Sequence, residues 1–294
     1  MRHEGGIASR LTAVAAPALP VARHVAGRSA DEVLTLLPRL FNLCRAAQGA
    51  GIAAALGRPF DAGGIARECL RDHLMKFHVT WPGYFGHPPV ALPADWQLGG
   101  AGLMRALFGA AQAPATMDAF EAFLSSASPL VQPLRLIRDS FAPHEAVAEG
   151  LPQVTFRSIW QTAPFENSVA GRHAGHPVMV ALGNSYGRGP LWRAAARLYD
   201  IEAAALGRLP EVDCQHGAAM VPAARGAYGI RIELDGDVVT DIARVTPTDA
   251  LLAEGGILDR TLASLPAIRQ GLAPLVLDIL DPCSPVRLRE ASDA

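Results

Sequence analysis

Two cysteines near opposite ends of the chain are the residues best suited to metal chemistry. Cys44 lies in the segment LPRLFNLCRAAQ (residues 37–48), and Cys283 lies in LDPCSPV (residues 280–286). Four cysteines in 294 residues are too few for a disulfide scaffold, so they are expected to be free thiols or metal ligands. Thiolates are soft ligands that suit transition metals. A lone cysteine on an apolar helix is also commonly buried for packing alone, and that interpretation stays open for Cys44.

Size and composition predict a single domain over residues 1–294. Half of the residues are hydrophobic and 18% are charged, a balance that is enough to build a large core and is compatible with an apolar docking face. The net charge of −2 gives no reason to expect nucleic-acid binding, and the only lysine, Lys76, does not lie in a P-loop. With no apolar run of about 18 residues and no signal peptide, the protein is expected to be cytoplasmic and not to span a membrane.

Periodicity and capping residues predict a mainly helical fold. Ser29 and Glu32 have the spacing of a capping box, and the helix they begin should reach about residue 56 with a break or kink near Pro38. Further helices are predicted over 65–77, 116–125, 134–147, 191–206, 249–254 and 258–270. Residues 11–25 predict two short strands, and Asp235-Gly236 between apolar runs predicts a β-hairpin. The fold class is therefore α+β, mainly α with a small β element.

The order of residues around the two cysteines resembles two motifs of the large subunit of nickel-iron hydrogenases. In that family R-x-C-G-x-C and D-P-C-x-x-C together supply four thiolates. Residues 39–44 match the first and last positions of the first motif, but Phe41 stands in place of its first cysteine. Residues 281–283 match the start of the second motif, whereas Val286 stands in place of its last cysteine. Half of the thiolates are therefore missing.

Other segments follow in the order of the same family. Residues 2–5 look like the start of the N-terminal R-x-E-G-H, and Arg172 lies in a region loosely similar to E-x-G-P-L-A-R. Residues 223–229, AARGAYG, resemble A-P-R-G-A-L-G, and residues 245–248, VTPT, resemble V-x-P-T. With two cysteines missing, the chain is most similar to the HupK/HoxV family of hydrogenase formation proteins, which are related to large subunits.

This resemblance implies a large-subunit-like fold and a role in maturation rather than catalysis. The family is thought to act as a scaffold for the Fe(CN)2CO part of the nickel-iron cofactor. The implied partners are other hydrogenase maturation proteins and the large-subunit precursor. Because two of the four thiolates are absent, a complete nickel-iron site is not expected, and the iron fragment would be bound transiently. A related alternative is a metal-free docking chaperone that acts only through its surface.

The resemblance also implies roles for individual residues. Cys44 and Cys283 would bind the metal, and Arg225, Pro247 and Thr248 would surround the iron fragment. Cys44 corresponds to a thiolate that bridges iron and nickel, whereas Cys283 corresponds to one that binds nickel alone, so either Cys283 turns to the iron or a nickel-like position is also used. The guanidinium of Arg225 would offset the charge of the thiolates and donate a hydrogen bond to one cyanide, with Thr248 donating to the other. Two simpler interpretations stay open, namely that Arg225 only caps the hairpin or forms a surface ion pair and that Thr248 only caps the next helix.

Two unrelated chemistries also fit parts of the sequence. Residues 183–187 match G-x-S-x-G after an apolar run, so Ser185 is a candidate nucleophile of a serine hydrolase. His216 is the only histidine after it, which leaves little room for the Ser-Asp-His order of that fold. Separately, His173 and His176 together with Cys214 and His216 could form a zinc site.

Overall fold

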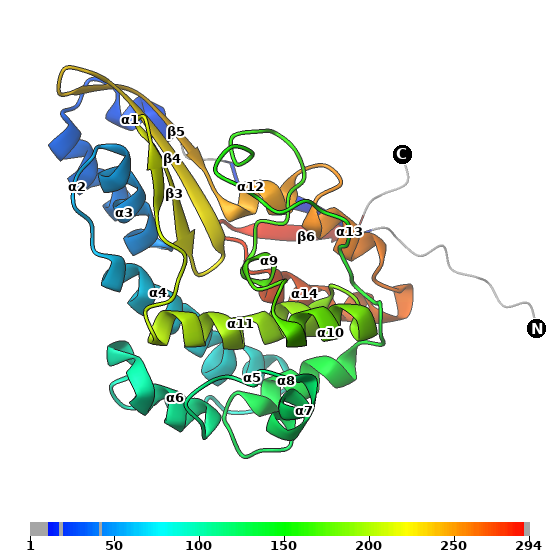
Figure 1. The fold of residues 1–294 in the computed structure, drawn as a ribbon. Coiled ribbons are helices and arrows are strands. Elements are labelled where there is room, and N and C mark those ends of the chain that lie inside the picture. Colours follow the sequence, from blue (N-terminus) through cyan, green and yellow to red (C-terminus); the bar gives the residue numbers. More distant parts are fainter. Residues whose placement is uncertain (1–10, 18–19, 41–42, 291–294) are drawn as a thin grey trace, which may run out of the picture.

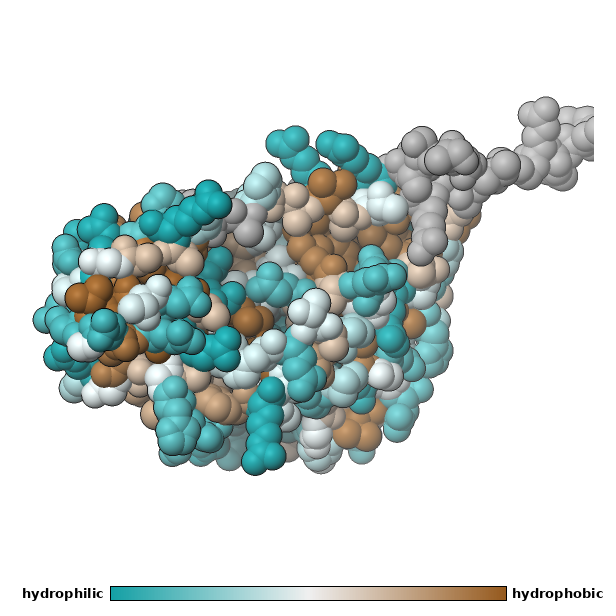
Figure 2. Space-filling model, turned by 90° about the horizontal axis from the view of Figure 1, so that it is seen from above, coloured by the Kyte–Doolittle hydropathy of each residue, from teal (hydrophilic) through white to brown (hydrophobic). Residues whose placement is uncertain are grey.

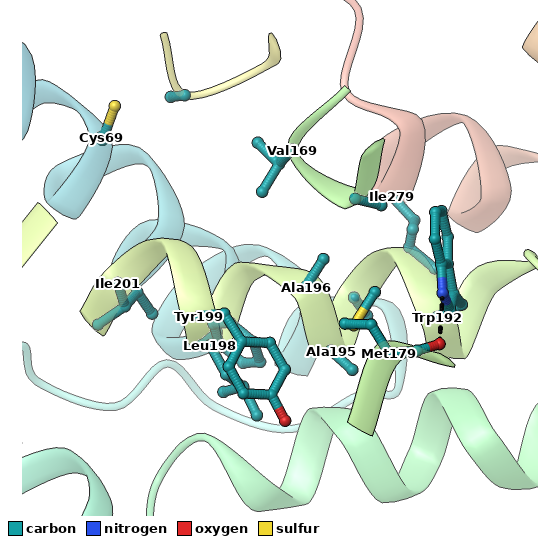
Figure 3. Close-up of a cluster of buried hydrophobic side chains, with 14 of the residues drawn as sticks. Cys69, Val169, Met179, Trp192, Ala195, Ala196, Leu198, Tyr199, Ile201 and Ile279 are labelled. Carbon is teal, nitrogen blue, oxygen red and sulfur yellow. Dashed lines mark hydrogen bonds between the residues drawn. The ribbon is translucent and has the colours of Figure 1, made fainter. Parts of the chain in front are cut away.

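The computed structural model describes residues 11–17, 20–40 and 43–290, and its main helix is α11, Pro190–Ala205. Almost every residue of α11 is buried, because apolar residues at helical spacing and small alanines cover most of its surface and the charged Arg193, Arg197 and Asp200 have buried partners. The helix crosses the middle of the molecule, with α4 and the larger sheet on one side and α6 and α8 on the other (Figure 1). In the core around α11, Trp192 donates its indole N–H to the carbonyl of Met179 at 3.0 Å (Figure 3).

The remaining helices surround this core and the larger sheet. They are α1 (Val21–Val25), α2 (Ala30–Leu40), α3 (Arg45–Ala55), α4 (Ala62–Met75), the π-helix η1 (Lys76–Thr80), α5 (Trp81–Tyr84), η2 (Trp96–Leu98), α6 (Gly100–Phe108), α7 (Met117–Leu124), α8 (Val131–Ser140), α9 (Val169–Arg172), α10 (Pro177–Tyr186), α12 (Pro247–Leu252), α13 (Ile257–Ala263), η3 (Ala267–Leu272) and α14 (Ala273–Leu280). None of the helices in the described residues has both the length and the hydrophobicity that a membrane span requires.

The strands form two small antiparallel sheets. The larger has the order β2 (Asp213–Gln215), β3 (Ala218–Ala223), β4 (Gly226–Asp235) and β5 (Val238–Val245). The smaller pairs β1 (Leu11–Ala15) with β6 (Val286–Glu290), so segments from the two ends of the chain lie side by side. Helix α3 packs against β3 and β4, and a second apolar core lies between helices α1, α2 and α3 and strands β4 and β5. The fold is therefore of the predicted α+β class.

Several local predictions are confirmed. Ser29 and Glu32 form the expected reciprocal cap, with amide-to-side-chain distances of 2.9 and 3.3 Å. The helix that follows ends at Leu40, two residues after Pro38, and α3 begins at Arg45. The hairpin turn at Asp235-Gly236 also forms, and Gly236 has a φ of 61°. Three predictions are wrong. Residues 21–25 form helix α1 instead of a second strand, and this lets Val21 and Val25, one turn apart, both face β4 and β5. The helix predicted over 134–147 ends at Ser140, shortly before Pro143, and the one predicted over 258–270 is divided into α13 and η3 at Pro266.

Hydrophobic residues also reach the surface in several places. Figure 2 shows them gathered at the end of the molecule where α1, α2 and the β4–β5 turn lie. At that turn, Leu234 and Val238 are 46% and 43% exposed. The most exposed apolar side chains, Leu98 at 80% and Ile268 at 91%, belong to other elements.

Candidate functional site

Cys44 lies at the start of α3 in a strained backbone conformation. Its φ of 52° and ψ of 38° are left-handed, which is uncommon for a residue with a side chain, and its side chain makes no cap to the helix. The carboxylate of Glu68 on α4 takes that role, accepting the amide N–H groups of Ala46 and Ala47 at 2.8 and 3.2 Å. The Cys44 thiol is thereby left free to point into the core, where the residue is fully buried.

Cys283 lies just beyond α14, which is followed by Asp281 in another left-handed conformation with a φ of 55°. The Thr248 hydroxyl oxygen accepts the Cys283 amide N–H at 2.7 Å and lies 2.8 Å from its sulfur. Thr246, not Thr248, caps α12, through a capping box with Asp249. The interpretation of Thr248 as a helix cap is therefore wrong, and its side chain instead fixes the position of Cys283.

Arg225 lies in the two-residue turn between β3 and β4 and connects the cysteines to buried carboxylates. Its Nη1 donates to the Cys44 sulfur at 3.3 Å and to Asp72 Oδ2 at 2.8 Å. Its Nε lies 3.3 Å from Asp281 Oδ2, an ion pair without the geometry of a hydrogen bond. Because Arg225, Asp72 and Asp281 are all buried, this is not a surface ion pair, and the guanidinium faces the thiol directly.

The turn that carries Arg225 is held by two side chains from another part of the chain. Arg172 Nη2 donates to the carbonyls of Ala223 and Gly226 at 2.9 and 2.6 Å. Asn167 exchanges two hydrogen bonds with the backbone of Ala227, at 2.7 and 3.0 Å, as a neighbouring strand would. These contacts fix the direction in which the Arg225 side chain leaves the turn.

Substitution of Gly226 by alanine is expected to disturb this turn strongly. Its φ is 146°, and an added Cβ would lie 2.6 Å from the backbone oxygen of Asn167. The strained backbone and the clash should together cost roughly 3 kcal/mol in the free energy of unfolding. Gly236→Ala is the matched control, since Gly236 also has a positive φ but has open space around it, and should cost only about 1 kcal/mol. Chemical denaturation measures both, and equal losses would contradict the packing argument.

Tyr228 brings the two cysteines into one environment. It is fully buried on β4, and hydrogen-bond and charge interactions with both Cys44 and Cys283 contribute to its pKa. Burial raises the pKa of the Tyr228 phenol strongly and the two sulfurs raise it further, so the phenol keeps its proton and can donate it to a thiolate. Burial raises the pKa of the Cys44 thiol to about 12, while Arg225 and Tyr228 act in the opposite direction. In the absence of a metal, Cys44 is therefore a protonated thiol.

The raised pKa of Cys44 predicts a loss of stability in alkali. Because the folded-state pKa of the Cys44 thiol lies above its ordinary value of 9.0, the free energy of unfolding keeps its full value below about pH 9 and falls as the pH rises toward 12. At pH 10 the loss should be about 1.4 kcal/mol. Metal-free protein and Cys44→Ala can be compared by thermal unfolding at pH 7.5 and pH 10. The difference between the two proteins should shrink at the higher pH, and an unchanged difference would contradict the shift.

A second layer of charges surrounds the site. Burial alone would raise the pKa of Asp281, but Arg225, Arg197 and Lys76 together hold it below its ordinary range. Lys76 Nζ and Arg197 Nη2 lie 3.1 and 3.2 Å from this carboxylate. Arg197 also donates to Nδ1 of His73, whose Nε2 lies 2.6 Å from Asp200. Three cations thus compensate the negative charge of Asp281, so this carboxylate does not fully neutralise the positive charge of Arg225.

The structure brings the predicted site residues Cys44, Cys283, Arg225 and Thr248 together from four separate segments. Pro247 is buried at the start of α12 and borders a narrow pocket with Arg225 and Thr248. Asp72 and Tyr228 were not predicted from the sequence. A possible signal was that Tyr228 lies three residues after Arg225, within the AARGAYG segment. Residues 2–5 and Phe41, on which part of the resemblance rests, lie outside the described residues.

The serine hydrolase alternative is not supported by the local structure. The apolar run before Ser185 is a helix, α10, and Ser185 lies on its last turn instead of at a strand-to-helix turn. The nucleophile of that enzyme class requires such a sharp turn to expose its hydroxyl. The G-x-S-x-G match is therefore the end of a helix that stops at Gly187.

The zinc alternative also fails in the described part of the chain. His173 and His176 both lie against Tyr199, but no three His, Cys, Asp or Glu side chains there are placed to hold a metal ion. Nδ1 of His176 accepts the Val178 amide N–H at 3.3 Å, which places the ring proton on Nε2 and leaves no free lone pair there. His173 instead lies 2.8 Å from Asp200 through Nε2.

Comparison with known proteins gives one strong match. The chain is 45% identical over 276 residues to the hydrogenase expression/formation protein HupK of Rhodobacter capsulatus. The match covers 94% of this chain and 92% of that protein. No family model matches the sequence.

Proposed function

Because this chain belongs to the HupK family of hydrogenase expression/formation proteins, we propose that it acts in hydrogenase formation as a non-catalytic scaffold for the iron fragment of the cofactor. The family resemblance inferred from the motifs is thereby confirmed. The proposed cargo is Fe(CN)2CO, received from other maturation proteins and passed to the large-subunit precursor. The single observation that carries this proposal is that Cys44 and Cys283 both lie against Tyr228, with the Arg225 guanidinium 3.3 Å from the Cys44 sulfur.

The number of protein ligands fits a fragment that brings most of its own. Two cyanides and one carbonyl already occupy three positions on the iron, so two thiolates suffice and no third protein ligand is needed. Iron(II) with two cyanides is formally neutral, and two added thiolates give an anionic group that is costly to bury alone. Arg225 is placed to offset that charge, and Tyr228 and Thr248 can each donate a hydrogen bond to a sulfur. The residues present therefore fit this cargo.

The exposure of the two cysteines supports transfer better than permanent retention. Cys44 is fully buried, whereas Cys283 is partly exposed and lies between α14 and β6. Val286 occupies the place of another thiolate and forms the first residue of β6, paired with Ala15 of β1. Because this chain has two of the four thiolates of the related large subunits, a precursor that offers all four could withdraw the fragment from the Cys283 side.

Infrared spectroscopy tests this function most simply. The protein would be produced together with the hydrogenase maturation proteins and isolated without oxygen. We expect close to one iron per chain, two cyanide bands and one carbonyl band. Protein isolated in this way without iron or diatomic bands would contradict the proposed scaffold.

A further inference from the structure

Buried donors without partners indicate how a ligand would be oriented in the site. Within the described residues, three buried side-chain nitrogens lack a hydrogen-bond partner, namely His78 Nε2, Arg193 Nε and Arg225 Nε. Such groups are rare because each costs about 1–3 kcal/mol when left unpaired. Arg193 and Arg225 both border the narrow pocket that also contacts Pro247 and Thr248. The two arginines with an unpaired Nε–H thus line one small space, together with Thr248, and Arg225 and Thr248 in turn contact the sulfurs of Cys44 and Cys283.

The free donor of Arg193 follows from how the rest of its guanidinium is used. Arg193 projects from α11, and its side chain is only 4% exposed. Its two terminal nitrogens donate to the two carboxylate oxygens of Glu166 at 3.2 and 3.0 Å. Nη1 also donates to the Ser168 hydroxyl oxygen at 3.3 Å. This paired geometry fixes the plane of the guanidinium, and Nε is its one nitrogen without any hydrogen-bond partner in the described structure. The donor is therefore held rigidly before any ligand arrives.

Thr248, in contrast, has no proton to spare once Cys283 is a thiolate. A hydroxyl has one proton to donate, and the Thr248 oxygen already accepts the Cys283 amide N–H. The same oxygen lies 2.8 Å from the Cys283 sulfur, and while the thiol is protonated either the thiol or the hydroxyl can donate this hydrogen bond. A metal-bound thiolate has no proton, so the Thr248 O–H must then donate to sulfur. If Thr248 donated its proton to a cyanide instead, its hydrogen bond to the Cys283 sulfur would be lost.

We propose that Arg193 is a positioning residue of the scaffold, whose Nε–H donates to the nitrogen of one iron-bound cyanide while Arg225 serves the other. This inference rests on the proposed function and replaces Thr248 in the role that the motif resemblance assigned to it. A cyanide nitrogen carries negative charge and accepts hydrogen bonds strongly, whereas a carbonyl oxygen bound to iron is a poor acceptor. The two arginines would therefore distinguish the cyanides from the carbonyl and set the orientation of the fragment.

The test compares infrared spectra of loaded Arg193→Lys, Glu166→Gln and Thr248→Val proteins with that of the unaltered protein. Lysine places a methylene group where arginine has Nε, yet it keeps a positive charge beside Glu166. In Arg193→Lys one cyanide band should move to lower frequency, because the lost hydrogen bond no longer draws on the cyanide lone pair. The other cyanide band and the carbonyl band should move much less.

The two other variants separate this role from a structural one. Glu166→Gln weakens the same ion pair but keeps the Nε–H, so its cyanide bands should stay in place. Thr248→Val removes a hydrogen bond to the Cys283 sulfur, so all three bands should shift together as sulfur donates more electron density to iron. The proposal is overturned if Arg193→Lys leaves the cyanide bands unchanged, or if Glu166→Gln shifts them equally.

A further variant covers poor folding of Arg193→Lys. The double substitution Arg193→Met and Glu166→Met removes the buried pair without leaving an unpaired charge, and it should show the same selective band shift. Unchanged bands in the double variant would also overturn the role of Arg193. If the unaltered protein carries iron and diatomic bands, only the inference about Arg193 fails in that case. If it carries none, the scaffold function fails and this inference fails with it.

Discussion

A protein carrying Cys44→Ala and Cys283→Ala is expected to be isolated without iron and to reduce hydrogenase formation in cells to the level of a deletion strain. The reason is that these two thiols are the proposed protein bonds to the cargo, and no other thiol lies beside Arg225 in the described structure. The fold should persist, because replacing a buried thiol by a methyl group removes one heavy atom and costs roughly 1 kcal/mol. Iron analysis of the purified protein and hydrogenase activity of the complemented strain measure the two effects.

Cys69→Ala is the matched control for this variant. Cys69 is as fully buried as Cys44 and belongs to the same core, but in the described structure it makes no hydrogen bond to Arg225, Thr248 or Tyr228. It should lose a similar amount of stability and keep its iron. If the double variant still supports hydrogenase formation fully, the protein acts as a metal-free docking chaperone, and the scaffold proposal is wrong.

Arg225→Met should have the second largest effect, on both stability and cargo. The substitution leaves Asp72 and Asp281 buried beside an apolar side chain, and breaking a buried ion pair in this way costs about 3 kcal/mol or more. In a domain of this size this is a fall of roughly 6–12 °C in Tm. Iron should also be lost, because nothing else within hydrogen-bond distance of the Cys44 sulfur carries a positive charge in the described structure. Calorimetry and iron analysis give the two values.

A second substitution separates these two effects. Asp72 keeps Arg71 as a partner in Arg225→Met but loses its buried one. Asp72→Asn combined with Arg225→Met removes the charge of this carboxylate, so part of the unfolding free energy should return. The iron content should not return, because the cation that faces the thiol is still missing. Restored iron in the double variant would show that Arg225 only maintains the fold.

Local features of the fold could be predicted from the sequence because short-range chemistry determines them. The Ser29 cap, the break after Pro38 and the Asp235-Gly236 turn each depend on residues within a few positions of one another. The long helix α11 was also predictable, since its apolar residues repeat over four turns. The interpretation of Ser185 as a hydrolase nucleophile was wrong because a short apolar run before a glycine fits either a strand or a buried helix.

The site was only partly predictable because it is assembled from distant segments. The family resemblance identified residues from four of them, but it could not supply Asp72 on α4 or the free donor of Arg193 on α11. Whether a buried arginine has a partner for each N–H depends on the packing of helices far apart in the chain. The hydrogen bonds between Thr248 and Cys283 likewise depend on where α12 lies relative to the end of α14.

The central claim is that thiols from the two ends of the chain bind the same iron atom. X-ray absorption spectroscopy at the iron edge, on protein loaded in cells and isolated without oxygen, counts the sulfur neighbours of that atom. The account predicts two sulfurs per iron in the unaltered protein and one in Cys283→Ala, measured on whatever iron remains. Iron with no sulfur neighbour, or a sulfur count that Cys283→Ala leaves unchanged, would contradict it.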